Sequence, residues 1–291
     1  MNIGCCIATK DIPLAKEFGY DYVELSAKEI MKMDTELWKL KRKEILHPGI
    51  PVLGFSAFAD EQMPLIGPSA QEEVWSAYLD ILLERASQLH IKNIGIGAPK
   101  ARMIPSEYDY GLATREMEYF LYTAARKANS YDITILYEAL HPKECNFGNH
   151  TQECYQTVKH IHSPNLKLVY DVYHAINTGE QYADSRMCFD EIRHVHINSW
   201  DQGLQRYFLF EKDLPYVKDL CVFLQSVGYD NTISVEAFDA DFPETGAASV
   251  SIIREALYEA EIKHPLSRTP SLSESSPLSR FLNFFSFSDE I

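Results

Sequence analysis

The stretch Leu166-Lys167-Leu168-Val169-Tyr170-Asp171 is a short β-rich run that stays largely apolar until it ends on an acidic residue. Similar runs recur along the chain, and the segments between them carry apolar residues at helical spacing, as Trp75, Leu79 and Leu82 do. The runs number eight and lie at residues 2–7, 21–25, 51–56, 93–97, 134–138, 166–171, 194–198 and 232–236.

Regular alternation of strand and helix predicts a parallel sheet with right-handed crossovers. Eight such units in roughly 240 residues favour closure into a barrel over an open doubly wound sheet. The turn after the first run, Ile7-Ala8-Thr9-Lys10, lacks the Gly-x-Gly-x-x-Gly fingerprint of dinucleotide-binding sheets. The predicted fold is therefore an α/β protein of the (β/α)8 TIM barrel class.

The chain has 291 residues, which is within the range of a single α/β barrel. Two helices are expected to end at Gly19 and Gly228, each within a Gly-Tyr-Asp turn. After about His264 the composition changes to Ser, Pro and Leu. We predict a barrel domain over residues 1–264 and a poorly ordered tail over residues 265–291, with docking of the aromatic cluster at residues 281–285 as the alternative.

The overall composition excludes several classes of partner. The formal net charge of −15 repels polyanions, and no basic stripe is present to bind nucleic acid. No apolar run approaches 18 residues and no secretory signal pattern begins the sequence, so neither membrane spanning nor secretion is expected. The six cysteines form no Cys-x-x-Cys pair, which is typical of reduced thiols in a cytoplasmic protein.

Four successive predicted strands carry an ionisable residue at the C-terminal end, where barrel enzymes place their sites. These residues are Glu138, Asp171, His196 and Glu236. A single member is explained by pairing with a lysine or by capping of the next helix, but three converging carboxylates would repel one another without a cation between them. The oxygen-rich donor set predicts one divalent metal ion, with Mn²⁺ favoured and Mg²⁺ or Co²⁺ as alternatives.

The motifs around these residues resemble those of the xylose isomerase-like TIM barrels, and among them the ketose 3-epimerases of the tagatose and psicose type. The resemblance covers roughly Met1 to Ala260. Glu138 with Glu144 six residues later is similar to the family's strand-five motif, although His141 stands in place of the family's Asn.

Three further motifs carry the resemblance. Asp171 with His174 three residues later is similar to the strand-six motif of a metal ligand and a substrate-binding His. His194-Val195-His196 is similar to the strand-seven His-x-His, and Ser234-Val235-Glu236 to the end of strand eight. The resemblance implies a metal site of Glu138, Asp171, His196 and Glu236 and a small sugar as substrate.

A mechanism follows from this arrangement. A ketose would chelate the metal through two oxygens, which acidifies the C–H bond between them. Glu138 and Glu236 would be the catalytic residues, one removing the proton and the other returning it. His174 would help to stabilise the ene-diolate, and Glu144 would bind a terminal hydroxyl.

The sequence also departs from the epimerase pattern. The family has a sugar-binding Arg six residues after the metal-binding His of strand seven, whereas this chain has Gln202, and Arg206 is a substitute only after a shift. The family's Pro-Gly-Glu-Gly loop is replaced by residues 207–211. The identity of the sugar therefore stays open.

The expected function is a metal-dependent isomerase or epimerase, most specifically a ketose 3-epimerase. Aldose–ketose isomerases, hydroxypyruvate-type isomerases and dehydratases or lyases share the same quartet. A nuclease of the endonuclease IV type would need extra histidines at strands three and four, where residues 55–57 and 97–99 offer none. A barrel without catalytic activity is a further functional alternative. For the assembly, a homo-oligomer is one alternative.

Two neighbouring polar residues have predicted supporting roles. His194 lies one layer deeper than His196, which indicates a hydrogen-bonded core position. Glu24 ends the second predicted strand and either supports the metal site or accepts a helix-capping amide.

Overall fold

A closed eight-stranded parallel barrel forms the body of the protein in the computed structural model, in the strand order β1-β10-β7-β6-β5-β4-β3-β2. The structure describes residues 1–200, 205–238 and 241–263. The strands are β1 (Asn2–Ile7), β2 (Tyr22–Ser26), β3 (Val52–Ser56), β4 (Asn93–Ile96), β5 (Thr134–Glu138), β6 (Leu166–Asp171), β7 (Ile192–Ile197) and β10 (Thr232–Glu236). The predicted barrel is therefore confirmed, and the ends of these strands lie within two residues of the predicted ones.

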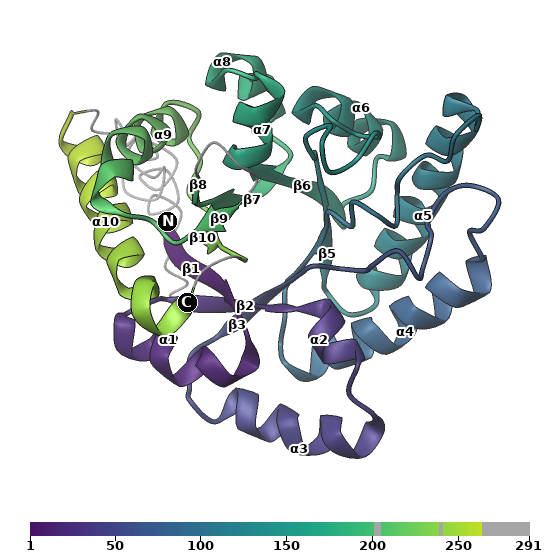
Figure 1. Ribbon diagram of the computed structural model, residues 1–291, viewed down its shortest axis with the longest axis horizontal. Helices are drawn as coiled ribbons and strands as arrows, with labels where there is room; N and C mark the ends of the chain where they lie inside the picture. The colour runs from purple at the N-terminus through teal and green to yellow at the C-terminus, as the bar shows by residue number, and fades with distance from the viewer. Residues whose placement is uncertain (201–204, 239–240, 264–291) are drawn as a thin grey trace, which may run out of the picture.

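Helices surround the strands on the outside of the barrel (Figure 1). They are α1 (Ile12–Phe18), α2 (Ala27–Met31), α3 (Thr35–Leu46), α4 (Glu72–Gln88), α5 (Tyr110–Asn129), α6 (Thr151–Ile161), α7 (Val172–Thr178), α8 (Tyr182–Ser185), α9 (Leu214–Ser226) and α10 (Phe242–Lys263), with short 3-10 turns η1 (Thr9–Asp11), η2 (Arg186–Cys188) and η3 (Glu211–Asp213).

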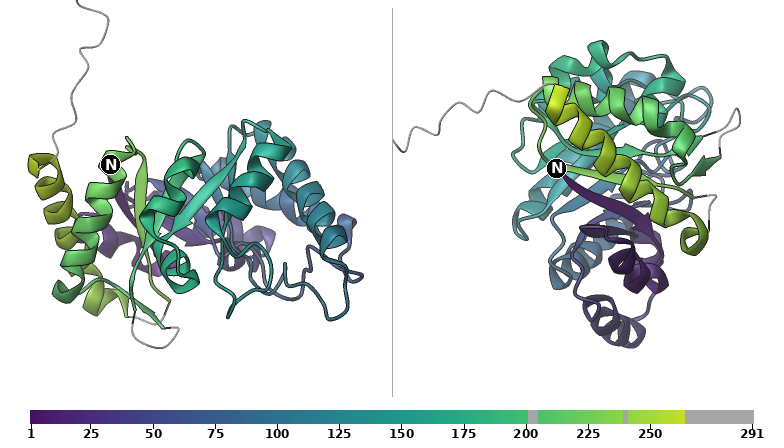
Figure 2. Two further views of the ribbon diagram at one scale, coloured as in Figure 1. Left: turned by 90° about the horizontal axis from the view of Figure 1, so that it is seen from above. Right: turned by 90° about the vertical axis from the view of Figure 1, so that its left-hand side faces the viewer.

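The helices pack through the apolar faces that their sequences predict. In α4 the residues Trp75, Leu79 and Leu82 are all buried, as expected for a stripe at helical spacing. The final helix α10 packs against α9 and α1 and runs along the outer side of the barrel (Figure 2). Among the described residues, no helix combines the length and apolar character needed to span a bilayer.

Two glycines end helices as predicted. Gly19 follows α1 at a φ of 84°, and Gly228 follows α9 at a φ of 70°. Both angles lie in the left-handed region, where a residue with a Cβ is strained. These turns return the chain to the next strand, so they help to fix the start of β2 and β10.

A two-stranded antiparallel ribbon, β8 (Ser199–Trp200) with β9 (Arg206–Tyr207), follows β7 at the mouth of the barrel, and the sequence did not predict it. The predicted tail, residues 265–291, and Gln202 lie outside the described residues.

Candidate metal centre

The four side chains of the predicted quartet meet inside the mouth of the barrel. Glu138, Asp171 and Glu236 are the last residues of β5, β6 and β10, and His196 is the penultimate residue of β7. Strand register aligns them, since Asp171 pairs with His196 across β6 and β7. Each offers one ligand atom, all four atoms lie within 4.8 Å of one another, and all four residues are buried.

The two carboxylate oxygens of Asp171 have different surroundings. Its Oδ1 accepts the backbone N–H groups of Tyr173, at 2.7 Å, and His174, at 3.2 Å, and so caps the N-terminus of α7. Its Oδ2 has no hydrogen-bond partner among the described residues. The helix-capping explanation therefore accounts for only one of the two oxygens, and the other is available as a ligand.

The ring of His196 is oriented by carboxylates on both sides. Its Nδ1 lies 3.5 Å from Glu138 Oε1 and 3.7 Å from Glu236 Oε1, whereas its Nε2 lies 3.4 Å from Glu24 Oε1. The same Glu24 oxygen lies 2.7 Å from His194 Nε2. A carboxylate that accepts the second ring N–H of a ligating histidine is the usual support of a metal site.

Glu24 contacts both histidines of the His-x-His motif. Its side chain is buried and lies within 3.4 Å of His194 and His196, which favours the supporting role over the helix-capping alternative. His194 is hydrogen-bonded in the core through Nδ1 to Thr232 Oγ1 at 2.7 Å, which agrees with its predicted position.

Three buried polar atoms within the quartet have no hydrogen-bond partner in the described part of the chain. They are Glu138 Oε1, Asp171 Oδ2 and His196 Nδ1. A buried acceptor without a partner costs about 1–3 kcal/mol, and these atoms face a common point. One divalent cation coordinated by them would satisfy all three, so the residues fit a metal ion with mixed oxygen and nitrogen ligands.

The ionisation of the carboxylates reflects their burial. Desolvation raises the pKa of Glu236 to about 8, with the nearby Glu138 adding to the shift and His196 opposing it. Desolvation also raises the pKa of Asp171 to about 6. Burial lowers the pKa of His196, but the carboxylates Glu236 and Glu24 outweigh it and the net shift is upward. Without a cation, protons neutralise part of the cluster.

Gly97, directly after β4, makes room for the Glu138 carboxylate. A Cβ at this position would lie 2.5 Å from Glu138 Oε2, so the carboxylate would have to move. The sequence did not predict this role of Gly97. The close approach depends on β4 and β5 being neighbours, which a lone glycine in a strand does not reveal.

The β8–β9 ribbon brings Arg206 over the cluster. Its Nη1 donates to Glu236 Oε2 at 2.9 Å and its Nη2 donates to Glu144 Oε1 at 2.7 Å. The guanidinium carbon lies 4.5 Å from the centroid of the Tyr173 ring. The structure therefore brings Arg206 together with the other predicted site residues.

His174 and Glu144 complete the predicted set. His174 Nδ1 accepts the backbone N–H of His141 at 3.2 Å, which puts the proton of the neutral ring on Nε2, 3.4 Å from Arg206 Nη2. Burial first, and then Arg206, lower the pKa of His174. His141, at the family's Asn position, is buried with its Nε2 3.4 Å from Glu144 Oε1.

A cavity of about 140 Å³ opens above the quartet and is called the inner chamber. Its walls include Glu138, Glu236 and His196 together with the three other predicted residues Glu144, His174 and Arg206. Every described side chain that the sequence assigned to the site, except the helix-capping Asp171, therefore lines one cavity.

Solved structures share this architecture. The chain is similar to a D-psicose 3-epimerase with D-tagatose from Clostridium cellulolyticum H10, at 17% identity and a TM-score of 0.73, over 88% of this chain and 99% of that one. It is similar to a 3-keto-D-glucoside 4-epimerase from E. coli, at 16% identity and a TM-score of 0.70, over 88% and 99% of the two chains. At these identities the likeness shows the fold.

A third solved structure comes from another functional class. It is an AP endonuclease, family 2, from Brucella melitensis, at 21% identity and a TM-score of 0.62, over 81% of this chain and 93% of that one. A comparison with curated proteins gave no match. A family described as "Xylose isomerase-like TIM barrel" matches residues 12–264, and the chain therefore belongs to the xylose isomerase-like TIM barrel family.

Proposed function

We propose that the protein is a metal-dependent sugar isomerase or epimerase that moves a proton on a carbon next to a carbonyl, and most specifically a ketose 3-epimerase. The observation that carries the proposal is the buried quartet, with ligand atoms from four adjacent strands within 4.8 Å and three of them without a partner in the described residues. The epimerases among the similar structures support the same reaction class.

Glu138, Asp171, His196 and Glu236 would hold the ion, with Mn²⁺ as our choice and Mg²⁺ or Co²⁺ as alternatives. When bound, the ion would polarise the substrate's carbonyl oxygen and so make the neighbouring C–H bond more acidic.

Two glutamates on opposite sides of the cluster are suited to proton transfer but differ in their surroundings. Glu138 Oε2 lies against the Gly97 position in the wall of the inner chamber and takes the proton from the substrate carbon. Glu236 Oε2 accepts a hydrogen bond from Arg206. Substrate oxygens must therefore draw the guanidinium away before Glu236 returns a proton to the opposite face.

Two N–H donors are available for a substrate oxygen that gains negative charge. His174 carries its proton on Nε2, and Arg206 Nη2 lies 3.4 Å away. Arg206 Nη2 also donates to Glu144, and a substrate oxygen placed between the two N–H groups would accept from both. Glu144, bound to Arg206 and close to His141, is placed to accept a hydroxyl of the same substrate.

The nuclease alternative has less support. Nucleases of the endonuclease IV type bind additional metal ions through histidines after strands three and four, but Ser56, Ala57, Gly97 and Ala98 occupy those positions here. The net charge of −15 also opposes binding of a polyanion. The six cysteines are free and buried, which supports a reducing compartment such as the cytoplasm.

The proposal is tested by measuring bound metal in the purified protein and deuterium uptake from D₂O into a panel of ketohexoses. We expect stoichiometric divalent metal and exchange at one carbon. Glu138→Gln should reduce exchange at least about 100-fold, whereas the exposed Glu17→Gln should leave it unchanged. Inversion at the exchanging carbon indicates an epimerase, movement of the carbonyl an isomerase, and loss of water a lyase. A protein without stoichiometric metal contradicts the proposal.

A further inference from the structure

A second and larger cavity, which the proposed reaction does not use, adjoins the inner chamber. This outer chamber has a volume of about 550 Å³ and lies over the ends of β1, β2 and β10. The two cavities share the wall residues Lys28, Ser56, Ala57 and Phe238. The outer chamber therefore borders the cavity over the quartet along these four side chains.

The two volumes differ in what they can enclose. Cavities that hold a whole ligand usually measure about 300–1,000 Å³. The inner chamber, at about 140 Å³, lies below this range, and the outer chamber lies within it. The inner chamber therefore fits the reacting part of a substrate, and the outer chamber offers space for a covalently attached second part.

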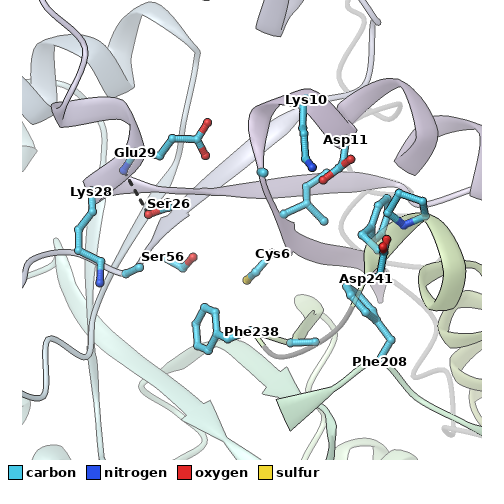
Figure 3. A pocket seen from close by; sticks show the side chains of 16 residues that line it. Cys6, Lys10, Asp11, Ser26, Lys28, Glu29, Ser56, Phe208, Phe238 and Asp241 are labelled. Carbon is cyan, nitrogen blue, oxygen red and sulfur yellow. Dashed lines mark hydrogen bonds between the residues drawn. The ribbon is translucent and has the colours of Figure 1, made fainter. Parts of the chain in front are cut away.

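Charged groups of both signs line the outer chamber. Figure 3 shows Lys28 on one side of the cavity and Lys10 and Asp11 on another. Neither lysine ammonium group has a carboxylate within 4.0 Å in the described part of the chain. Glu29 and Asp241 also line the cavity, so its wall includes three acidic residues and two lysines. An anionic group would meet a net negative wall, whereas a neutral polyol finds both donors and acceptors.

An aromatic side chain stands at the junction of the two chambers. Phe238 is 57% exposed, and its ring centroid lies 5.3 Å from the guanidinium carbon of Arg206. Phe208 and Phe242 add further aromatic wall to the outer chamber. The C–H face of a sugar ring packs on such a surface while its hydroxyls reach the charged groups.

We propose that the outer chamber binds a neutral glycosyl unit attached to the reacting sugar, so that the preferred substrate is a glycosylated ketose. This inference rests on the proposed function for the reacting end and adds the substrate class. Lys28 at the junction donates to the linkage region, Lys10 and Asp11 bind hydroxyls of the distal ring, and Phe238 packs against it.

The test compares ligand affinities of the full-length, Mn²⁺-loaded protein by calorimetry. The probes are fructose, isomaltulose and trehalulose, which are fructose with glucose on O6 and on O1, and fructose 6-phosphate. We expect at least one of the two glucosides to bind about tenfold or more tightly than fructose. Equal affinity of fructose and both glucosides would overturn the proposal, as would a gain confined to the phosphate.

Two variants locate the extra affinity. Ala8 lines only the outer chamber, and Ala8→Phe should bring the ratio of glucoside affinity to fructose affinity close to one. Lys10→Ala, a milder change, should reduce the same ratio by about threefold or more. Ala70 lines neither chamber, so Ala70→Phe is the matched control and should keep the ratio of glucoside affinity to fructose affinity unchanged. A ratio unchanged in both Ala8→Phe and Lys10→Ala would refute the assignment.

Deuterium exchange on the same samples separates the two proposals. If deuterium exchanges into fructose but neither glucoside binds more tightly than fructose, the proposed reaction is supported and the glycosyl site is refuted. Tighter binding of a glucoside, lost in Ala8→Phe and without exchange on any probe, supports the glycosyl site and contradicts the proposed reaction.

Discussion

At the scale of single residues, the site depends on side chains that serve two partners at once. Asp171 caps α7 with one oxygen and offers the other to the quartet. Glu24 holds both His194 and His196. Arg206 joins Glu144 to Glu236. Because each of these groups is buried, losing one partner leaves the other with an unsatisfied charge or donor.

Arg206 tests this residue-scale coupling. In Arg206→Lys a single ammonium replaces the fork that reaches both carboxylates, and a lysine does not reproduce the bidentate geometry. We expect kcat/KM for proton exchange to fall about 10- to 100-fold, the value of one charged hydrogen bond, while the bound metal stays stoichiometric. The exposed Arg186→Lys serves as control. An Arg206→Lys enzyme with unchanged kcat/KM would show that the guanidinium takes no part.

At the scale of elements, the end of each strand decides how closely neighbouring side chains approach. The end of β4 carries Gly97 next to the carboxylate at the end of β5, where a Cβ would lie 2.5 Å from Glu138 Oε2. At Gly95 in the same strand a Cβ would meet its nearest atom at 3.6 Å, an ordinary contact. The two glycines form a matched pair for substitution.

Gly97→Ala should displace the Glu138 carboxylate and weaken metal binding at least about tenfold, because a ligand is moved from its position. Gly95→Ala should leave the metal affinity within about twofold of the unmodified protein. Calorimetric titration of Mn²⁺ into the metal-free variants measures both affinities. Equal affinities in the two variants would mean that the strand end has no effect on ligand position.

The ribbon is the second element that matters. β8 and β9 pair Trp200 with Arg206, and this pairing carries the arginine back over the mouth after the chain has left β7. Arg206 Nη2 thereby meets Glu144, which is 62 residues away in the sequence. The antiparallel ribbon that follows β7 is thus part of the candidate site as well as a connection between strands.

At the scale of the whole molecule, the closed barrel buries acidic groups that a cation or protons must neutralise. Metal-free protein holds Asp171 and Glu236 with pKa values of about 6 and 8, above the ordinary carboxyl values of about 4. A raised carboxyl pKa stabilises the fold at low pH, and this stabilisation is lost as the pH rises through the folded-state pKa.

Because of these two groups, the Tm of the metal-free protein should fall as the pH rises from about 4 to about 8. A divalent ion replaces the protons, so the rise in Tm on adding Mn²⁺ should be larger at pH 8.5 than at pH 6. The same Mn²⁺ concentration is used at both pH values; where it is about 100 times the Kd at pH 8.5, the rise in Tm at pH 8.5 should be about 4–5 °C. Anaerobic thermal unfolding with EDTA or Mn²⁺ measures it. A rise in Tm that is the same at both pH values would contradict the burial argument.

The sequence by itself determined the barrel and the four residues that we propose as metal ligands. Strand and helix periodicities are local patterns, and a polar residue at the end of an apolar run, such as Asp171, is visible without knowing its neighbours. Because parallel strands in a barrel bring their C-terminal ends to one mouth, the quartet followed from position alone.

The tertiary structure alone decided what surrounds the quartet. The link from His194 to Glu24 spans 170 residues, and the position of Arg206 depends on a two-residue ribbon that no periodicity announces. The fit of Gly97 against Glu138 and the shared wall of the two chambers at Lys28 and Phe238 also arise from contacts between separate strands and loops. Such contacts are set by how the closed barrel packs, which is why the local sequence indicated the candidate ligands and only the fold showed what surrounds them.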